Sequence, residues 1–363
     1  MKVVIIGGTG HAGTYLVPRL IEAGHEVVSV SRQESSPYQS NAMWDAVQQV
    51  QIDRFHAEEQ GTFGQQIREL NGDAVIDMIC FTPGSVRHLV EALRDHVQHF
   101  LHCGSIWVHG HSVSVPTEET QPRDPFGNIR DGTIEEREKS GYGINKAAIE
   151  SYLLVEARQF GFPATVLHPG HIVGPGYAPI NPLGNFNAQV FNKLARGENV
   201  TLPNFGLETC HHVHADDVAQ AFIKALGNWS NAVGESFHVV SPSALTYRGY
   251  AESMASWFGQ PAKLSFLPWE EWKKTVSYNE ARTSRDLIAH SPNCSIAKAQ
   301  RLIDYHPRYS SLQAVQESVQ WLIDIGLFTD EATEFIKNIS VTYAESHCFE
   351  KEIGEWLGRD SRH

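Results

Sequence analysis

Apolar residues form short, unbroken runs along the first two thirds of the chain, and helical or looped stretches separate them. The runs lie at 3–6, 26–30, 74–79, 99–103, 164–168 and 236–240, with a weaker one at 47–52. An apolar run of this length is typical of a strand buried on both faces. Strands that alternate with helices predict an α/β fold with a doubly wound parallel sheet.

The first run leads directly into a glycine-rich turn, MKVVIIGGTGHAG. Gly7 permits a tight turn, Gly10 lets backbone N–H groups approach a pyrophosphate, and Gly13 allows close packing of the next helix. A helix N-terminus at this place is an anion site. Strand, turn, helix and second strand within thirty residues predict dinucleotide binding.

The second strand ends in Ser31 and Arg32. A ribose 2′-hydroxyl requires a carboxylate near this point, whereas a 2′-phosphate requires a hydroxyl and a guanidinium. The sequence therefore favours NADP, with NAD as the alternative. Asp53 follows the run at 47–52 and is a candidate adenine contact, although an Asp at a strand end is also a common helix cap.

The pattern changes after residue 246 to helices with short breaks, at 247–258, 269–276, 296–303, 312–325 and from 330 onward. These helices cannot all pack on the sheet. We therefore expect a Rossmann-type dinucleotide-binding domain at 1–173 plus 211–241. We expect a smaller, mostly helical substrate-binding lobe at 174–210 plus 242–325, and a helical tail at 326–363.

Length and charge narrow the function classes. The 363 residues suffice for these two domains. The net charge of −13 without a cluster of Lys and Arg disfavours a nucleic-acid partner. A strand begins at residue 2, no apolar run approaches the ~18 residues of a membrane span, and the five cysteines are scattered. We expect a cytoplasmic protein with free thiols and no membrane partner.

Tyr142 and Lys146 lie four residues apart in a helical stretch that runs to about Phe160, so both side chains share a face. An ammonium group near a tyrosine stabilises the phenolate and lowers its pKa toward the neutral range. Ser105 lies just past the predicted strand at 99–103, where its hydroxyl could bond a substrate carbonyl or alkoxide. The three residues are the candidate catalytic group.

In combination, the motifs resemble the extended short-chain dehydrogenase/reductase family, the NAD(P)-dependent epimerase/dehydratase type. The resemblance covers residues 1 to about 325 and rests on Gly7-x-x-Gly10-x-x-Gly13, Ser105 ahead of Val108-His109-Gly110, Tyr142-x-x-x-Lys146, His168-Pro169-Gly170 leading to Gly174-Pro175-Gly176, and His214-Ala215-Asp216-Asp217-Val218-Ala219. It implies that Tyr142 is the acid/base and that Ser105 holds the reacting oxygen. It also implies that Lys146 binds the nicotinamide ribose and that the helix of Tyr142 pairs with its copy in a homodimer.

Departures from the family pattern bear on the substrate. Cys210 stands where the family often has an Arg for the substrate diphosphate, while Arg301 matches a second such Arg. His168 stands where an Arg is frequent, and His109 where a Tyr is frequent. We therefore treat His109, His168 and Arg301 as candidate substrate-binding residues, and a sugar or sugar-like alcohol as the expected substrate, with or without a nucleotide.

Three alternatives remain beside a sugar epimerase or oxidoreductase. One is an NADPH-dependent carbonyl reductase, and another is a non-catalytic dinucleotide sensor. The third is an RNA-binding relative like the chloroplast stem-loop binding branch, which the acidic charge and the intact Tyr142 and Lys146 disfavour. Cys210, His212 and His214 alternate along one stretch and could face the same side. The family pattern gives His214 a structural role, so we expect no metal.

Overall fold

The computed structural model describes residues 1–32, 37–110, 112, 114–123 and 141–326. The chain forms two compact units. The first consists of Met1–Gly170, Ala215–Val240 and Cys294–Arg308, and the second of His171–His214, Ser241–Asn293 and the chain from Tyr309. Among the described residues, no helix combines the length and apolar composition that a membrane span needs.

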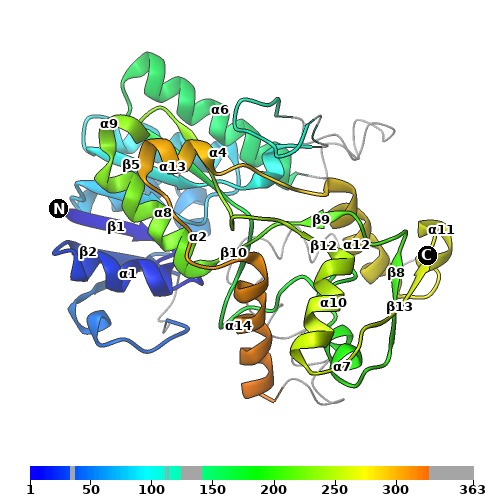
Figure 1. The fold of residues 1–363 in the computed structure, drawn as a ribbon. Coiled ribbons are helices and arrows are strands. Elements are labelled where there is room, and N and C mark those ends of the chain that lie inside the picture. The colour runs from blue at the N-terminus through cyan, green and yellow to red at the C-terminus, as the bar shows by residue number, and fades with distance from the viewer. Residues whose placement is uncertain (33–36, 111, 113, 124–140, 327–363) are drawn as a thin grey trace. The chain divides into compact units, whose positions relative to one another are not determined.

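The first unit is built on a parallel sheet of seven strands in the order β11-β6-β5-β4-β1-β2-β3. Figure 1 labels β1, β2 and β5 of this sheet. Their bounds are β1 Lys2–Ile6, β2 Glu26–Ser31, β3 Gln48–Gln51, β4 Ala74–Asp77, β5 His99–Cys103, β6 Ala164–Pro169 and β11 Ser236–Val239. The sequence order departs from β1 in both directions, and this confirms the predicted doubly wound sheet. All seven predicted apolar runs form strands of it.

Helices flank this sheet. They are α1 Gly13–Glu22, α2 Arg54–Glu59, α3 Phe63–Glu69, α4 Pro83–Leu93, α6 Tyr142–Phe160, α8 Ala215–Gly227, α9 Trp229–Ala232 and α13 Ala297–Ile303, with 3₁₀ turns η1 Ala42–Ala46 and η2 Ile106–Val108. Apolar residues of α3, α4 and α6 share one buried cluster with alternate residues of the strands, such as Val4, Val75 and Phe100. Helices α1 and α8 pack against each other. The candidate residues Gly7, Arg32 and Ser105 lie in the loops that follow the carboxyl ends of β1, β2 and β5.

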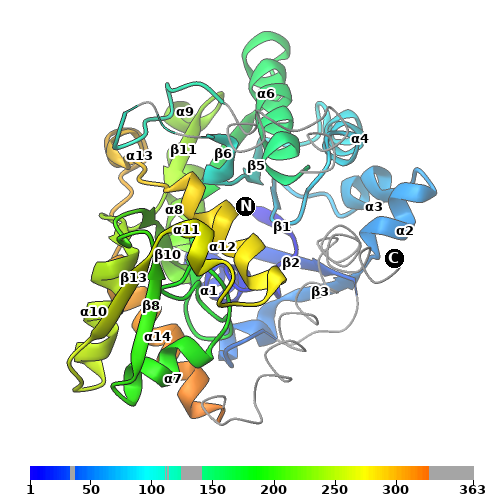
Figure 2. The ribbon, with the colours of Figure 1, turned by 90° about the vertical axis from the view of Figure 1, so that its right-hand side faces the viewer.

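The second unit contains three small two-stranded sheets and five helices among the described residues. The pairs are β7 His171–Val173 with β10 His212–His214, β9 Thr209–Cys210 with β12 Leu245–Thr246, and β8 Asn199–Pro203 with β13 Lys263–Leu267. Figure 2 shows β8 and β13 side by side. The helices are α7 Gln189–Ala195, α10 Tyr247–Trp257, α11 Trp269–Trp272, α12 Tyr278–His290 and α14 Ser311–Asp324. Their common core includes Phe191, Tyr250, Met254 and Val315.

The observed division differs from the predicted one mainly at 294–308, which belongs to the first unit. Two bonds show why: Lys298 Nζ donates to Ser236 O at 2.8 Å, and the buried Tyr305 hydroxyl donates to Val240 O at 3.2 Å. Residues 171–173 and 211–214 fall in the second unit because β7 and β10 pair with each other. Beyond Gly326, the predicted tail lies outside the described residues.

Candidate active site

The turn after β1 is built so closely that only glycine fits at its ends. Gly7 has a φ of +87°, and its N–H donates to Val30 O at 2.8 Å. A Cβ on Gly13 would lie 2.0 Å from Gly8 O, and a Cβ on Gly8 would lie 2.5 Å from Ser29 Oγ. Gly8 lies outside the predicted motif of Gly7, Gly10 and Gly13. The tight backbone at the start of α1 fits a dinucleotide pyrophosphate.

Ser31 is the last residue of β2, Arg32 follows it, and Asp53 lies just after the neighbouring strand β3. Ser31 is half-buried, and Arg32 is exposed. Asp53 caps α2, because its Oδ1 accepts the N–H of His56 at 3.2 Å. Asp53 is therefore a helix cap. Contacts of Ser31, Arg32 and Asp53 with a cofactor stay predictions.

Lys146 is buried under the carboxyl ends of two central strands. Its Nζ donates to Cys80 O at 2.8 Å and to Cys103 O at 2.7 Å, so it bridges the segment that follows β4 and the last residue of β5. The side chain is 2% exposed. Desolvation by burial lowers the pKa of this ammonium group. Because water screens a buried cation little, this ammonium group interacts strongly with neighbouring charges.

Tyr142 is the first residue of α6, one turn before Lys146. The Lys146 Nζ lies 5.8 Å from the centre of the Tyr142 ring and 4.9 Å from that of Phe81. The spacing of four residues therefore brings the phenol and the ammonium group to one side of the helix, as the sequence pattern predicts.

Ser105 follows β5 and caps η2. Its Oγ accepts the N–H of Trp107 at 3.2 Å, and its backbone is extended. The residue is 6% exposed, and η2 packs against α6. Because the hydroxyl uses a lone pair for the cap, its proton is available for another acceptor.

The candidate substrate-binding residues have different surroundings. His168, at the end of β6, is fully buried, and its Nδ1 accepts the N–H of Ser105 at 3.0 Å. His109 is buried, with its Nε2 at 2.9 Å from His238 Nε2, and burial lowers its pKa to about 4. Arg301 is exposed on α13, which packs on β11, α8 and α9. The first unit thus brings His168 to Ser105 and leaves Arg301 in solvent.

A family model, the NAD dependent epimerase/dehydratase family, matches residues 3–239, which is more than half of the chain. The chain belongs to this family. The match spans the glycine turn, Ser105, Tyr142 and Lys146.

Individual relatives are distant. The chain is 25% identical over 321 residues to a UDP-glucose 4-epimerase of Mycolicibacterium smegmatis, covering 82% of this chain and 96% of the relative. It is 24% identical over 351 residues to the chloroplast stem-loop binding protein of 41 kDa b of Arabidopsis thaliana, covering 91% and 82%. A crystal structure of UDP-glucose 4-epimerase from Thermotoga maritima aligns with a TM-score of 0.65 at 20% identity, covering 90% and 99%. This last likeness shows the fold.

The sequence pattern did not predict an ion pair between the half-buried Arg123 and the buried Glu150. Arg123 donates to both carboxylate oxygens of Glu150, at 2.7 and 2.6 Å, and Glu150 Oε1 lies 3.0 Å from His168 Nε2. Burial opposes ionisation of Glu150, yet the hydrogen bonds and opposite charge of Arg123 hold its pKa well below its usual range. The available signal was spacing, because Glu150 follows Lys146 by four residues and shares its inward face.

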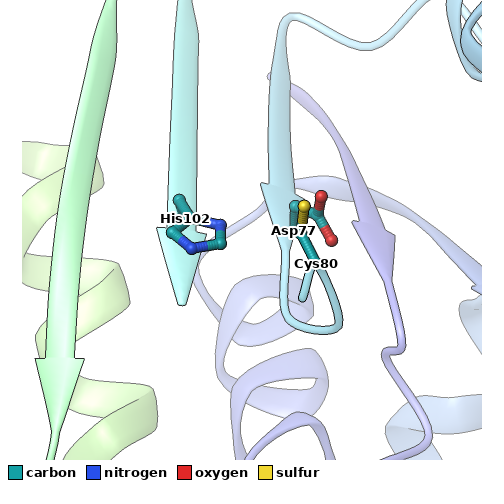
Figure 3. A group of neighbouring side chains, drawn as sticks. All are labelled: Asp77, Cys80 and His102. Carbon is teal, nitrogen blue, oxygen red and sulfur yellow. The ribbon is translucent and has the colours of Figure 1, made fainter. Parts of the chain in front are cut away.

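One group of three side chains among the described residues is close enough to hold a metal ion (Figure 3): Asp77, Cys80 and His102, whose ligand atoms lie within 4.8 Å of one another. Asp77 is paired with the Arg54 guanidinium at 2.8 Å. Burial raises the pKa of the Cys80 thiol to about 12. A paired carboxylate and a protonated thiol are poor ligands for a divalent cation.

The stretch of Cys210, His212 and His214 makes other contacts in the second unit. The Cys210 thiol donates to Leu245 O at 3.7 Å. His214 stacks on Tyr309 with 3.9 Å between ring centres, and its Nε2 lies 3.0 Å from Glu317 Oε2. These partners give both residues structural roles.

Proposed function

We propose that the protein is an NADP-dependent sugar epimerase or oxidoreductase with Tyr142 as its acid/base. The observation that carries the proposal is the buried Lys146 ammonium group, which is fixed at the ends of β4 and β5 beside the Tyr142 ring. The bound nicotinamide would supply hydride acceptance and donation. NADP is proposed over NAD because the end of β2 carries Ser31 and the exposed Arg32, a hydroxyl and a guanidinium that suit a 2′-phosphate.

The three candidate residues have distinct roles in this proposal. Tyr142 removes the proton of a sugar hydroxyl and returns it to the carbonyl oxygen in the reverse direction. Lys146 stabilises the phenolate form and holds the nicotinamide ribose. Ser105 donates its hydroxyl proton to the reacting oxygen, while Trp107 N–H holds the other side of that hydroxyl.

The expected substrate is a sugar or nucleotide sugar, by similarity to the UDP-glucose 4-epimerase of Mycolicibacterium smegmatis. Cys210 in place of an Arg weakens the case for a diphosphate, and a smaller sugar alcohol would not need one. Arg301, His109 and His168 stay predictions for substrate contact.

The proposal is tested by incubating the full chain with UDP-glucose, UDP-galactose and free sugars, each with NADP⁺, NADPH, NAD⁺ or NADH. An epimerase converts the sugar with no net change in cofactor, whereas a carbonyl reductase oxidises NADPH in proportion to product. Failure to bind any nicotinamide dinucleotide in calorimetry would reject the proposal.

RNA binding is the second candidate, favoured by the 24% identity to the chloroplast stem-loop binding protein over 91% of this chain. The net charge of −13 opposes it, because phosphate contacts depend on clustered cations. A gel shift with a stem-loop RNA at low and high salt tests this candidate function. A complex that forms at low salt and is lost at high salt supports RNA binding. A dinucleotide sensor would instead bind cofactor and not depend on Tyr142.

A further inference from the structure

A buried histidine determines how the backbone of Ser105 is held. The N–H of Ser105 donates to His168 Nδ1 at 3.0 Å. An Nδ1 that accepts this bond carries no proton, and the other ring nitrogen, Nε2, lies 3.0 Å from Glu150 Oε1. Arg123 fixes Glu150 in turn with bonds of 2.6 and 2.7 Å. One ring nitrogen of His168 therefore accepts from Ser105, and the other lies next to the carboxylate that Arg123 holds.

The same imidazole ring occupies the space of a side chain at residue 104. A Cβ on Gly104 would lie 2.3 Å from His168 Nδ1 and 2.7 Å from His168 Cε1. The Gly104 N–H is also fixed, because it donates to Leu167 O at 2.7 Å. Gly104 and His168 are thus complementary in shape, and the ring reaches Ser105 only because residue 104 lacks a side chain.

We infer that His168 is a positioning residue that sets the orientation of Ser105. The inference rests on the proposed function for the role of the Ser105 hydroxyl. Ser105 is held at two points, its N–H by His168 and its Oγ by the N–H of Trp107. Removing the first point frees the Ser105 backbone, so the hydroxyl loses its fixed direction toward the reacting oxygen.

The first test is made on the full chain without substrate, by NMR of ¹⁵N-labelled protein. The native protein is expected to give a coupling across the hydrogen bond between Ser105 ¹⁵N and His168 ¹⁵Nδ1. In His168→Leu, the Ser105 amide is expected to exchange with solvent at least ~10-fold faster. His168→Asn should restore most of the protection, because its carbonyl oxygen can accept in place of Nδ1.

Two further variants separate positioning from general loss of packing. Gly104→Ala should increase Ser105 exchange with His168 intact, because the added methyl displaces the ring. His99→Leu removes another buried histidine, which lies at the opposite end of β5 and is hydrogen-bonded to Thr165 Oγ1. This variant should leave Ser105 exchange unchanged. Unchanged Ser105 exchange in His168→Leu, or an equal increase in His99→Leu, would overturn the inference.

The second test uses a sugar that the protein turns over. If His168 acts through Ser105, His168→Leu should lower kcat about 10-fold or more in the native background and less than about 2-fold in Ser105→Ala. Losses that multiply would overturn the role in catalysis. Should no sugar be turned over, the proposed function fails, and the NMR result alone decides whether His168 positions Ser105.

Discussion

Gly13 and Gly8 lie so close together that a methyl group added at Gly13 would disrupt the turn. The Cβ of Gly13→Ala would lie 2.0 Å from Gly8 O, a backbone atom that cannot move without opening the turn. We expect at least a ~10-fold loss of NADPH affinity by calorimetry and a destabilisation of about 1–3 kcal/mol. Gly227→Ala, where nothing lies within 4 Å, is the control. Equal effects of the two substitutions would contradict the role given to the turn.

Arg32 carries the prediction of cofactor choice. Its side chain is exposed at the end of β2. Removing its charge should weaken binding only of a cofactor that carries a 2′-phosphate, which NADPH has and NADH lacks. Arg32→Ala should weaken NADPH about 10-fold or more and leave NADH nearly unchanged. Calorimetry with both cofactors checks this. Tighter binding of NADH than NADPH by the unmodified protein would reverse the assignment.

Among the helices and strands, the hydrophobic pattern of the sequence predicts apolar elements better than polar ones. The strands β1, β5 and β6 follow from continuous apolar runs, whereas α12 and the pair of β8 with β13 were not predicted. Helix α12 has few apolar residues, and its start is fixed by the reciprocal cap of Ser277 and Glu280. That cap, S-x-x-E, was the readable signal. Strand β13 exists through its pairing with β8, about 60 residues away, which a local pattern does not contain.

The exposed side of α6 is the expected dimer surface. Ile149 and Leu153 are buried in the protomer, whereas Val155 is 40% exposed on the same helix. We expect light scattering to give a dimer mass at micromolar concentration, and Val155→Glu to shift it toward the monomer because a charge would be desolvated. A monomer mass for the unmodified protein would exclude the dimer.

For the whole molecule, buried histidines predict loss of stability in acid. Desolvation by burial lowers the pKa of His99 and His109 to about 4, below the ordinary 6.5. As the pH falls, these histidines take up protons in the unfolded chain at a higher pH than in the native protein. Their contribution to the free energy of unfolding is therefore fully present above pH ~6.5 and falls as the pH drops toward ~4. The loss is up to about 1.4 kcal/mol per pH unit for each histidine.

Urea titrations between pH 7 and 4.5 measure this slope. His99→Gln should flatten it, because Gln cannot titrate but can still donate to Thr165 Oγ1, whose own proton is given to Ala232 O. An unchanged slope in this variant would show that His99 does not contribute.

The sequence predicted the sheet, the glycine turn and the pairing of Tyr142 with Lys146 because each depends on local spacing. It did not predict that His168 turns inward to Ser105, since that contact depends on the space that Gly104 leaves for the ring, and the two residues lie far apart in the chain. The same limit applies to 294–308, whose place in the first unit depends on bonds to β11 and the residue after it.

The most direct test of the account is the turnover of Tyr142→Phe on the sugar that the unmodified protein converts, with cofactor binding measured in parallel. Removing the phenolic proton carrier should lower kcat ~10²- to 10⁴-fold while NADPH affinity stays within about 2-fold. A Tyr142→Phe protein that keeps more than about half of the native turnover would contradict the account and place the chemistry elsewhere.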